Sequence, residues 1–414
     1  MRLAEPFWQR LLGVVRGGRS EKPVLGLLRL STPAWLCVIS SLLMCVLGVY
    51  IIDLTRASEW SGFGGMHPLS VRQAVFICVG IVAALVVALP HYRFMGMLSG
   101  PLMVLMVALL ILILLPVMPD SIVSRQRGAR SWINLGVADF QPSEIVKAVY
   151  VVLIAYYLRH RDDHRTVKGL VRVGVLTAVP VGLITVQPDL GTGLLFIPAL
   201  FAMLMAAGAR LRHLGLVVLC AAMAAPASYP LLKPHQKVRI DGLVQQIRGD
   251  RTTAHDINFQ SFTAQTLAGA GGIAGVGDAR SRAMVRYSRL PEAHNDMIFA
   301  VIVNRFGVLG GVGVVVLYGV WVAGALLTSV GCKSGLGRLI PIGLTAFMVG
   351  AALVHIGMNI GLLPITGINL PFISYGGSSM LSSWLMTGLV LSVGLHRAED
   401  TMRESFRFEE DDEN

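Results

Sequence analysis

The sequence consists mainly of long apolar runs separated by short polar connections. A membrane-spanning helix needs roughly 20 mainly apolar residues, and about ten runs approach that length. They cover Pro33–Leu54, Ala74–Leu89, Phe94–Met118, Pro142–Leu158, Leu170–Val186, Gly191–Ala209, Leu214–Leu232, Met297–Leu327, Leu339–Ile360 and Met380–Leu395. The pattern predicts an all-α, polytopic integral membrane protein with about ten transmembrane helices. Met297–Leu327 is too long for one straight crossing, and we expect an interfacial or tilted start.

Composition supports this class. Hydrophobic residues make up 54% and charged residues 14% of the chain, with a mean hydropathy of +0.66, whereas soluble domains carry roughly 25% charged residues. The net charge of +11 could suggest a nucleic-acid partner, but the basic residues form short clusters between apolar runs. That distribution is typical of membrane topology signals, so nucleic acid is not an expected partner. The five cysteines show no metal or disulfide spacing.

The basic clusters fall in alternate connections, before the first run and after the second, fourth, sixth, eighth and tenth. The positive-inside rule then places both termini in the cytoplasm. Residues 1–32 are expected to form a basic, amphipathic segment on the cytoplasmic surface. Residues 33–396 are the transmembrane domain, with a large extracytoplasmic loop at 233–296, and residues 397–414 are a cytoplasmic tail.

With this orientation, the polar segments that could carry chemistry share the outer side of the membrane. They are Arg127–Glu144, Gln187–Gly193, Lys233–Asp296 and Gly361–Ser379. Neither ATP nor nucleotide sugars are available there. A substrate of this protein must therefore carry its own activation energy.

The stretch LPEAHND holds Glu292, His294 and Asp296 directly before a long apolar run. A carboxylate at the mouth of a membrane helix is partly desolvated, so its pKa should rise toward the range useful to a general base. The alternative is an interfacial turn whose charges face water.

Other charged residues lie at the starts of predicted spans. Glu144 and Lys147 are spaced i, i+3 and face the same way, either as a structural ion pair or as a pair that lines a site. Asp189 precedes a glycine-rich helix start, where it could cap the helix or contact a substrate or cation.

Positive charge on the outer side runs against the topology rule and suggests capture of an anion. Arg127 and Arg130 lie in the third connection, and Arg305 lies within an apolar run, where a guanidinium needs a partner. Residues 361–379 combine prolines and glycines with Ser374, Tyr375 and Ser378. This segment either holds an anion at the start of the last helix or is a re-entrant turn that only packs. His355 and Asn359, spaced i, i+4, are interpreted mainly as helix–helix hydrogen-bonding residues.

Four of these stretches resemble one family. RGARSWINLGVADFQPSE, QPDLGTG, LPEAHND and PITGINLPFISYGGSS, in this order, are similar to the motifs of the SEDS family (shape, elongation, division, sporulation). The resemblance covers nearly the whole chain from the first span to the tenth. The PITGI wording and the short tail look more like RodA, the elongation member, than FtsW, the division member.

The resemblance implies a peptidoglycan glycosyltransferase of the bacterial cytoplasmic membrane that polymerises lipid II at the outer face. Its partner would be a class B penicillin-binding protein, the transpeptidase. The family's essential aspartate matches Asp296, and its Glu and Lys after FQPS match Glu144 and Lys147. Arg127, Arg130 and Arg305, or a divalent cation such as Mg²⁺ or Mn²⁺, could offset the charge of an undecaprenyl pyrophosphate leaving group.

The chain departs from the family pattern at three places. Asn295 replaces a threonine, Asn304 and Arg305 replace two acidic residues, and the glycine-rich turn continues as GDARSR. Two other functions stay open. A flippase or transporter for lipid-linked precursors would use Glu144, Lys147, Asp189 and Arg305 as a polar pathway, and a scaffold would only recruit the transpeptidase.

Overall fold

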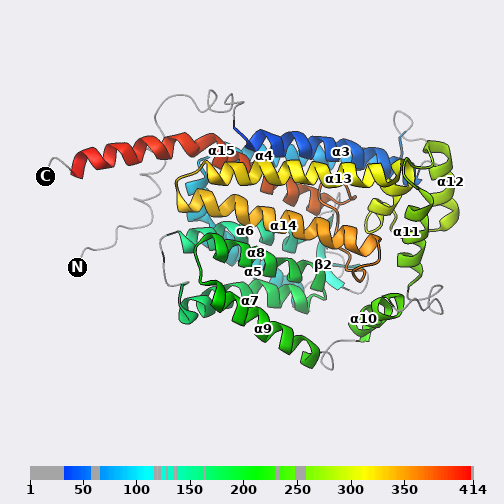
Figure 1. Cartoon of the computed structure of the whole chain (residues 1–414), viewed down its shortest axis with the longest axis horizontal. Coiled ribbons are helices and arrows are strands. Elements are labelled where there is room, and N and C mark those ends of the chain that lie inside the picture. Colours follow the sequence, from blue (N-terminus) through cyan, green and yellow to red (C-terminus); the bar gives the residue numbers. More distant parts are fainter. Residues whose placement is uncertain are drawn as a thin grey trace.

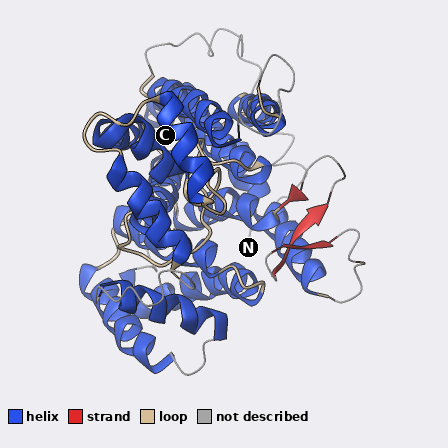
Figure 2. Ribbon diagram, turned by 90° about the vertical axis from the view of Figure 1, so that its right-hand side faces the viewer, coloured by secondary structure: helices blue, strands red, loops and turns tan. Residues whose placement is uncertain are grey.

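The computed structural model describes residues 32–56, 66–115, 119, 123–126, 129–134, 136, 139–159, 161, 165–228, 234–247 and 258–411. The described chain is a bundle of long helices with a small sheet at one side (Figures 1 and 2). The amphipathic segment predicted for residues 1–32 lies almost entirely outside the described residues.

Each of the ten predicted apolar runs corresponds to a helix. They are α3 (Ala34–Arg56), α4 (Pro68–Ala88), α5 (Tyr92–Leu114), α6 (Pro142–Leu158), α7 (Val167–Val186), α8 (Leu190–Ala206), α9 (Leu211–Ser228), α13 (Ile298–Val330), α14 (Gly335–Asn359) and α15 (Gly377–Asp411). Within the described part of the chain, seven helices are long and apolar enough to cross a membrane. The chain is thus a multi-pass helical membrane protein, while the total of ten crossings and the cytoplasmic termini stay predictions.

Helix α4 begins six residues earlier than the hydropathy pattern predicts. Pro68 stands at the first turn, where its fixed φ suits a helix start. His67 caps that turn, because its side chain accepts a hydrogen bond from the backbone N–H of Leu69 at 3.2 Å. Arg72 and Gln73 are consequently helical, and both turn out to matter for the site.

Helix α13 contains a break inside its length, whereas the excess length of the run predicts an interfacial or tilted start. Gly307 has φ 72° and ψ −168°, so the two halves meet at a kink. The freed N–H groups beyond the kink bond to the glycine-rich turn of the preceding loop, with Val308 N–H donating to Gly272 O at 2.9 Å. A side chain at Gly307 would collide with the backbone of Ile273. Only glycine fits this conformation and this approach.

The long connection forms three short helices, α10 (Pro234–Ile247), α11 (Phe259–Ala270) and α12 (Asp278–Ser288). Helix α11 has 12 residues, too few for a crossing, and packs along α13. The glycine-rich stretch after α11 is therefore not part of another span. These helices lie at the same end of the bundle as β2 (Figure 1).

A three-stranded antiparallel sheet precedes α6, and hydropathy gave no signal for it. Its strands are β1 (Val123–Gln126), β2 (Ala129–Asn134) and β3 (Asp139–Phe140). Figure 2 shows it standing beside the helices. At the opposite end, α15 continues past the predicted span to Asp411 and projects from the bundle (Figure 1).

Candidate active site

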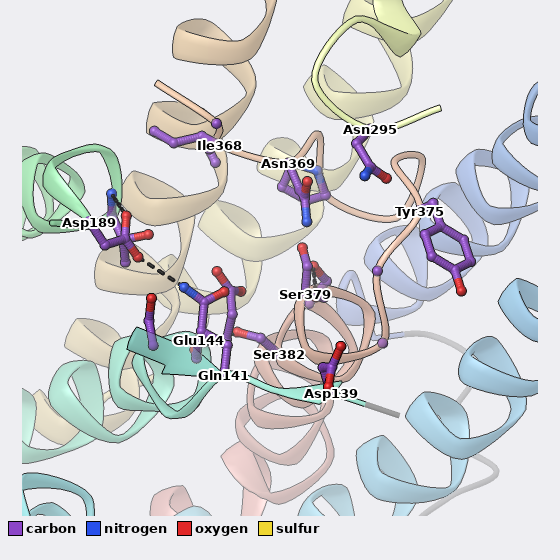
Figure 3. Close-up of a pocket in the computed structure, with 18 of the residues that line it drawn as sticks. Asp139, Gln141, Glu144, Asp189, Asn295, Ile368, Asn369, Tyr375, Ser379 and Ser382 are labelled. Atoms are coloured by element: carbon purple, nitrogen blue, oxygen red, sulfur yellow. Dashed lines mark hydrogen bonds between the residues drawn. The ribbon is translucent and has the colours of Figure 1, made fainter. Parts of the chain in front are cut away.

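The four polar segments meet at one pocket of about 520 Å³ (Figure 3). Each contributes to the wall: Ser131 to Glu144 from the first, Pro188 to Thr192 from the second, Asn295 and Asp296 from the third, and Thr366 to Ser379 from the fourth. Phe347, Met348 and Met386 add apolar surface from α14 and α15. The four segments therefore lie together, while their position on the outer side of the membrane stays a prediction.

Asp296 lies in the turn before α13 and lines the pocket with only 4% of its surface exposed. Three consecutive carbonyls of this turn accept hydrogen bonds from other elements. His294 O accepts from Tyr375 N–H at 3.0 Å, Asn295 O from the Ser374 hydroxyl at 2.8 Å, and Asp296 O from Asn359 Nδ2 at 2.9 Å. The backbone that carries Asp296 is thereby fixed from two sides.

Glu292 and His294 support this turn and are not among the residues that line the pocket. Glu292 has φ 51° and accepts a hydrogen bond from Asn295 Nδ2 at 2.8 Å. The His294 ring lies 5.7 Å from the Tyr375 ring, and Tyr375 does line the pocket. Their contribution visible here is to the shape of the turn.

Glu144 and Lys147 form the ion pair that their spacing predicted, with Lys147 Nζ 2.8 Å from Glu144 Oε2. Both are largely buried and both line the pocket, so the pair is structural and also accessible to a bound molecule. The Glu144 carbonyl accepts a hydrogen bond from Ser382 at 2.7 Å, which fixes α6 to α15.

Asp189 is the N-cap of α8, as one of its two predicted roles required. Its Oδ1 accepts from Thr192 N–H at 3.1 Å and its Oδ2 accepts from Gln141 Nε2 at 3.0 Å (Figure 3). Asp189 also lines the pocket. Burial raises the pKa of this carboxyl, although the hydrogen bonds from Thr192 oppose the rise.

Residues 360–376 form the irregular segment that the prolines and glycines predicted. Gln73 of α4 fixes this segment in place with two hydrogen bonds. Its side-chain amide donates to Ser374 O at 3.1 Å and accepts from Gly376 N–H at 3.2 Å. Ser378 bonds to the backbone of Asp139 and Gln141 at 3.1 and 2.9 Å. Ser374 and Ser378 thus hold the wall together, and neither is a lining residue.

Arg305, a predicted anion-binding residue, does not line the pocket. It lies near the α13 kink, where its Nε donates to the Tyr50 hydroxyl at 2.9 Å and lies 3.5 Å from Asp278 Oδ1. Asp278 also pairs with Arg282 at 2.8 Å. This set of Tyr50, Asp278, Arg282 and Arg305 is called the kink cluster below.

The other predicted arginines cannot be placed. Arg127 and the side chain of Arg130 lie outside the described residues. Within the described wall, the basic residues are Lys147 and Arg72. Lys147 is neutralised by Glu144, whereas Arg72, near the start of α4, forms no ion pair with another described residue. Arg72 is accordingly the cation best placed to meet an anion in the pocket.

The described residues hold no group of three or more His, Cys, Asp or Glu side chains arranged to bind a metal ion. Magnesium is often held by one or two carboxylates together with substrate phosphates. The divalent cation therefore stays a prediction, and no step proposed below passes through it.

Comparison with known proteins decides the family. The model of the cell cycle protein family that comprises FtsW, RodA and SpoVE matches residues 34–399. The chain belongs to this family, which is the SEDS family. Stage V sporulation protein E of Bacillus subtilis (strain 168) is 29% identical over 370 residues, covering 88% of this chain and 97% of the relative.

Two further relatives connect this SEDS chain to cell-wall synthesis. Peptidoglycan glycosyltransferase MrdB of Escherichia coli (strain K12) is 29% identical over 340 residues, which are 82% of this chain and 89% of MrdB. A chain in the structure titled "Structural coordination of polymerization and crosslinking by a peptidoglycan synthase complex" superimposes with a TM-score of 0.73. It is 27% identical, covering 88% of this chain and 98% of that chain.

Sequence reasoning on this SEDS chain missed several residues of the wall, namely Arg72, Asp139, Gln141, Asn369, Ser379 and Ser382. Gln141 and Asn369 lie inside the recognised motifs, but nothing in one sequence distinguishes them from neighbours that only pack. Arg72 had a detectable signal, since it is a charge next to an apolar run. The predicted start at Ala74 left it outside the helix.

Proposed function

We propose that this SEDS protein is a peptidoglycan glycosyltransferase that polymerises lipid II at the outer face of the cytoplasmic membrane. The observation that carries the proposal is the position of Asp296, buried in the wall of the pocket where all four family motifs converge. A carboxylate at this position suits a general base, and the relatives named as glycosyltransferases support the reaction class.

In the proposed reaction, Asp296 accepts the proton from the GlcNAc 4-hydroxyl of the acceptor lipid II. The acceptor oxygen then forms a bond to the anomeric carbon of the donor MurNAc, and the bond from that carbon to undecaprenyl pyrophosphate breaks. Attack opposite to the leaving group inverts the anomeric centre. The leaving group takes the electron pair, so the donor supplies the energy of transfer.

Arg72 would bind the departing diphosphate. One turn further along α4, the Phe76 ring lies 6.1 Å from the Tyr375 ring, and a Cβ added at Gly377 would meet it at 3.2 Å. Residues four apart share a helix face, so Arg72 lies on the face of α4 that borders the start of α15. An arginine and the positive end of a helix dipole both favour a diphosphate there.

Asp189 and the Glu144–Lys147 pair line a part of the pocket separate from Tyr375 (Figure 3). Among the described residues, the basic side chain on this side is Lys147, which is already paired with Glu144, so this side suits neutral sugar hydroxyls better than a diphosphate. We therefore assign the sugar rings to the Asp189 side, where carboxylates and amides such as Gln141 can accept or donate hydrogen bonds.

The cellular task is proposed from the motifs and the relatives. A RodA-like role in elongation and cell shape rests on the PITGI sequence, and a division role of the FtsW type is the alternative. A class B penicillin-binding protein is the proposed partner, supported by the synthase complex whose title couples polymerisation to crosslinking.

Transport of a lipid-linked precursor is less well supported. A transport pathway would need polar groups through the depth of the membrane, whereas the described polar wall gathers at one end of the bundle. Arg305, one member of the pathway considered for transport, is engaged in the kink cluster instead. The structure offers no observation that specifically favours a scaffold.

The test is polymerisation of labelled lipid II by the purified full chain in detergent or liposomes, alone and with its transpeptidase partner. We expect glycan polymer and release of undecaprenyl pyrophosphate, and we expect both to disappear in Asp296→Ala. Full activity of that variant would refute the proposal. Movement of lipid II between vesicle leaflets without polymer would support transport instead.

A further inference from the structure

Asn359, the last residue of α14, is fully buried and uses its side-chain amide to join three backbone positions. Its Nδ2 donates to Asp296 O at 2.9 Å and to His355 O at 2.8 Å. Its Oδ1 accepts from Ala300 N–H at 3.0 Å. Both donors and one acceptor position of the amide are therefore satisfied within the protein.

The bond to Ala300 replaces a cap that α13 lacks. Its N-cap residue is Met297, which makes no side-chain capping bond. The N–H groups of a first helical turn have no partner inside the helix, and the Ala300 N–H is one of them. Asn359 therefore caps α13 from a different helix, and the same amide holds the carbonyl of Asp296.

One turn earlier on α14, His355 bonds to a second segment of the pocket wall, at Ile368. Its Nδ1 lies 2.8 Å from Ile368 O, so Nδ1 is the protonated nitrogen that donates to this carbonyl. Ile368 lines the pocket, and the neighbouring Asn369 does so as well (Figure 3). The end of α14 thus positions two walls of the pocket through two side chains.

We propose that Asn359 is a positioning residue for Asp296, acting in the transfer step without touching substrate. The other two carbonyl bonds of the turn come from the irregular segment 360–376, at Ser374 and Tyr375. Only the bond from Asn359 ties the turn to a membrane helix, among the three bonds described. Without it, the Asp296 carboxylate can shift relative to the bound hydroxyl, and small shifts of a general base reduce the rate strongly.

This inference rests on the proposed function, since it needs Asp296 to act in the reaction. The test variant is Asn359→Leu. Leucine is close to asparagine in size and suits a buried position, but it cannot form the hydrogen bonds of the amide. Asn304→Leu is the matched control. Asn304 is equally buried and donates to Leu267 O at 2.8 Å, but it does not line the pocket or contact the Asp296 turn.

Initial rates of polymerisation are measured against lipid II concentration, with thermal stability of each variant in the same detergent. We expect Asn359→Leu to lower kcat at least tenfold while KM changes less than threefold, because substrate contacts remain and the base is displaced. Asn304→Leu should keep kcat within threefold. Asn359→Ser, which leaves room for a water molecule, serves as a second folded variant and should lose less kcat.

A kcat within twofold of the natural chain in folded Asn359→Leu would overturn the inference. So would an equal loss of kcat in Asn304→Leu, since that result would mean general weakening of the bundle. An inactive natural chain would instead contradict the proposed function, so the two failures are distinguishable.

Discussion

The molecule has two polar clusters at the same end of the bundle, and they use their charges differently. In the pocket wall, the backbone around Asp296 is held by amides, hydroxyls and N–H groups of other elements, while the acidic side chains line a cavity. In the kink cluster, Asp278 bonds to Arg282, Tyr50 and Arg305, and neither Asp278 nor Arg305 lines the cavity.

The comparison distinguishes charged residues that could bind a substrate from charged residues that only stabilise the fold. Arg282 and Tyr50 hold the pKa of Asp278 below its usual range, since both stabilise the ionised carboxylate. Asp278 is thus neutralised within the protein and secures α12 against α3 and α13. The acids of the pocket wall face a space that can take a substrate. Substitutions in the two clusters should therefore have different consequences.

Lys147→Met should cause the largest loss of stability. It leaves Glu144 as an unpaired, largely buried carboxylate, which costs about 3–5 kcal/mol when a buried ion pair is broken. Thermal unfolding in detergent measures the loss. The double variant Glu144→Gln/Lys147→Met should regain most of the stability but remain slow in polymerisation. Recovery of activity together with stability would show that the pair only sets helix register.

Gly307→Ala should destabilise the kink and leave the pocket chemistry intact. The residue has φ 72°, and an added Cβ would collide with Ile273, so the cost is about 1–3 kcal/mol or more. Gly313→Ala on the same helix is the control, since its Cβ would meet nothing within 4 Å. Equal melting temperatures for the two variants would contradict the kink as described.

Arg72→Gln and Arg305→Gln compare one arginine from each cluster. A charge-assisted hydrogen bond is worth about 1.5–3 kcal/mol, so we expect Arg72→Gln to lower kcat/KM roughly ten- to hundredfold. Arg305→Gln should change kcat/KM less than about threefold. Undecaprenyl pyrophosphate should also bind Arg72→Gln more weakly than the natural chain. A larger loss of kcat/KM in Arg305→Gln than in Arg72→Gln would indicate that the kink cluster binds the diphosphate.

Asp189→Asn should have the smallest effect, visible mainly in the pH dependence of stability. Burial raises the pKa of Asp189 above its unfolded value, so ionisation weakens the folded state. Stability from this group is present below the unfolded pKa of about 4 and is lost as pH rises through the raised folded value. In the variant, the side-chain amide oxygen can still accept from the Thr192 N–H, and the loss of stability with rising pH disappears because the side chain does not ionise. As pH rises from about 4, the melting temperature should therefore fall less in the variant than in the natural chain.

Hydropathy predicted the helices well because a membrane-spanning helix requires a continuous apolar run, and that run is visible in the local sequence. Pro142–Leu158 was predicted with both of its boundaries. For α13 the length of the run showed that one straight crossing does not fit, but the expected interfacial or tilted start is in fact a kink at Gly307. The small sheet was missed because its strands, at most six residues long, carry no apolar run of membrane length. Its existence depends on pairing between segments and not on local pattern.

The motifs predicted which segments form the site, but not which of their side chains line the pocket and which support its backbone. Asp296, Glu144, Lys147 and Asp189 were predicted and line the pocket. Arg305 was predicted from its burial cost, yet its partner Asp278 came from a loop whose position the sequence does not reveal. Asn359 was interpreted as a helix–helix hydrogen-bonding residue. Its contact with Asp296, 63 residues away in the chain, only appears in the fold.

The central claim is that Asp296, and not acidity at this end of the bundle in general, drives the transfer. The most direct measurement is the polymerisation rate of two isosteric variants, Asp296→Asn and Asp278→Asn, at equal amounts of folded protein. General-base catalysis contributes about 10²–10⁴-fold, so Asp296→Asn should be slower than Asp278→Asn by at least about 10²-fold. Equal rates for the two variants would contradict the account.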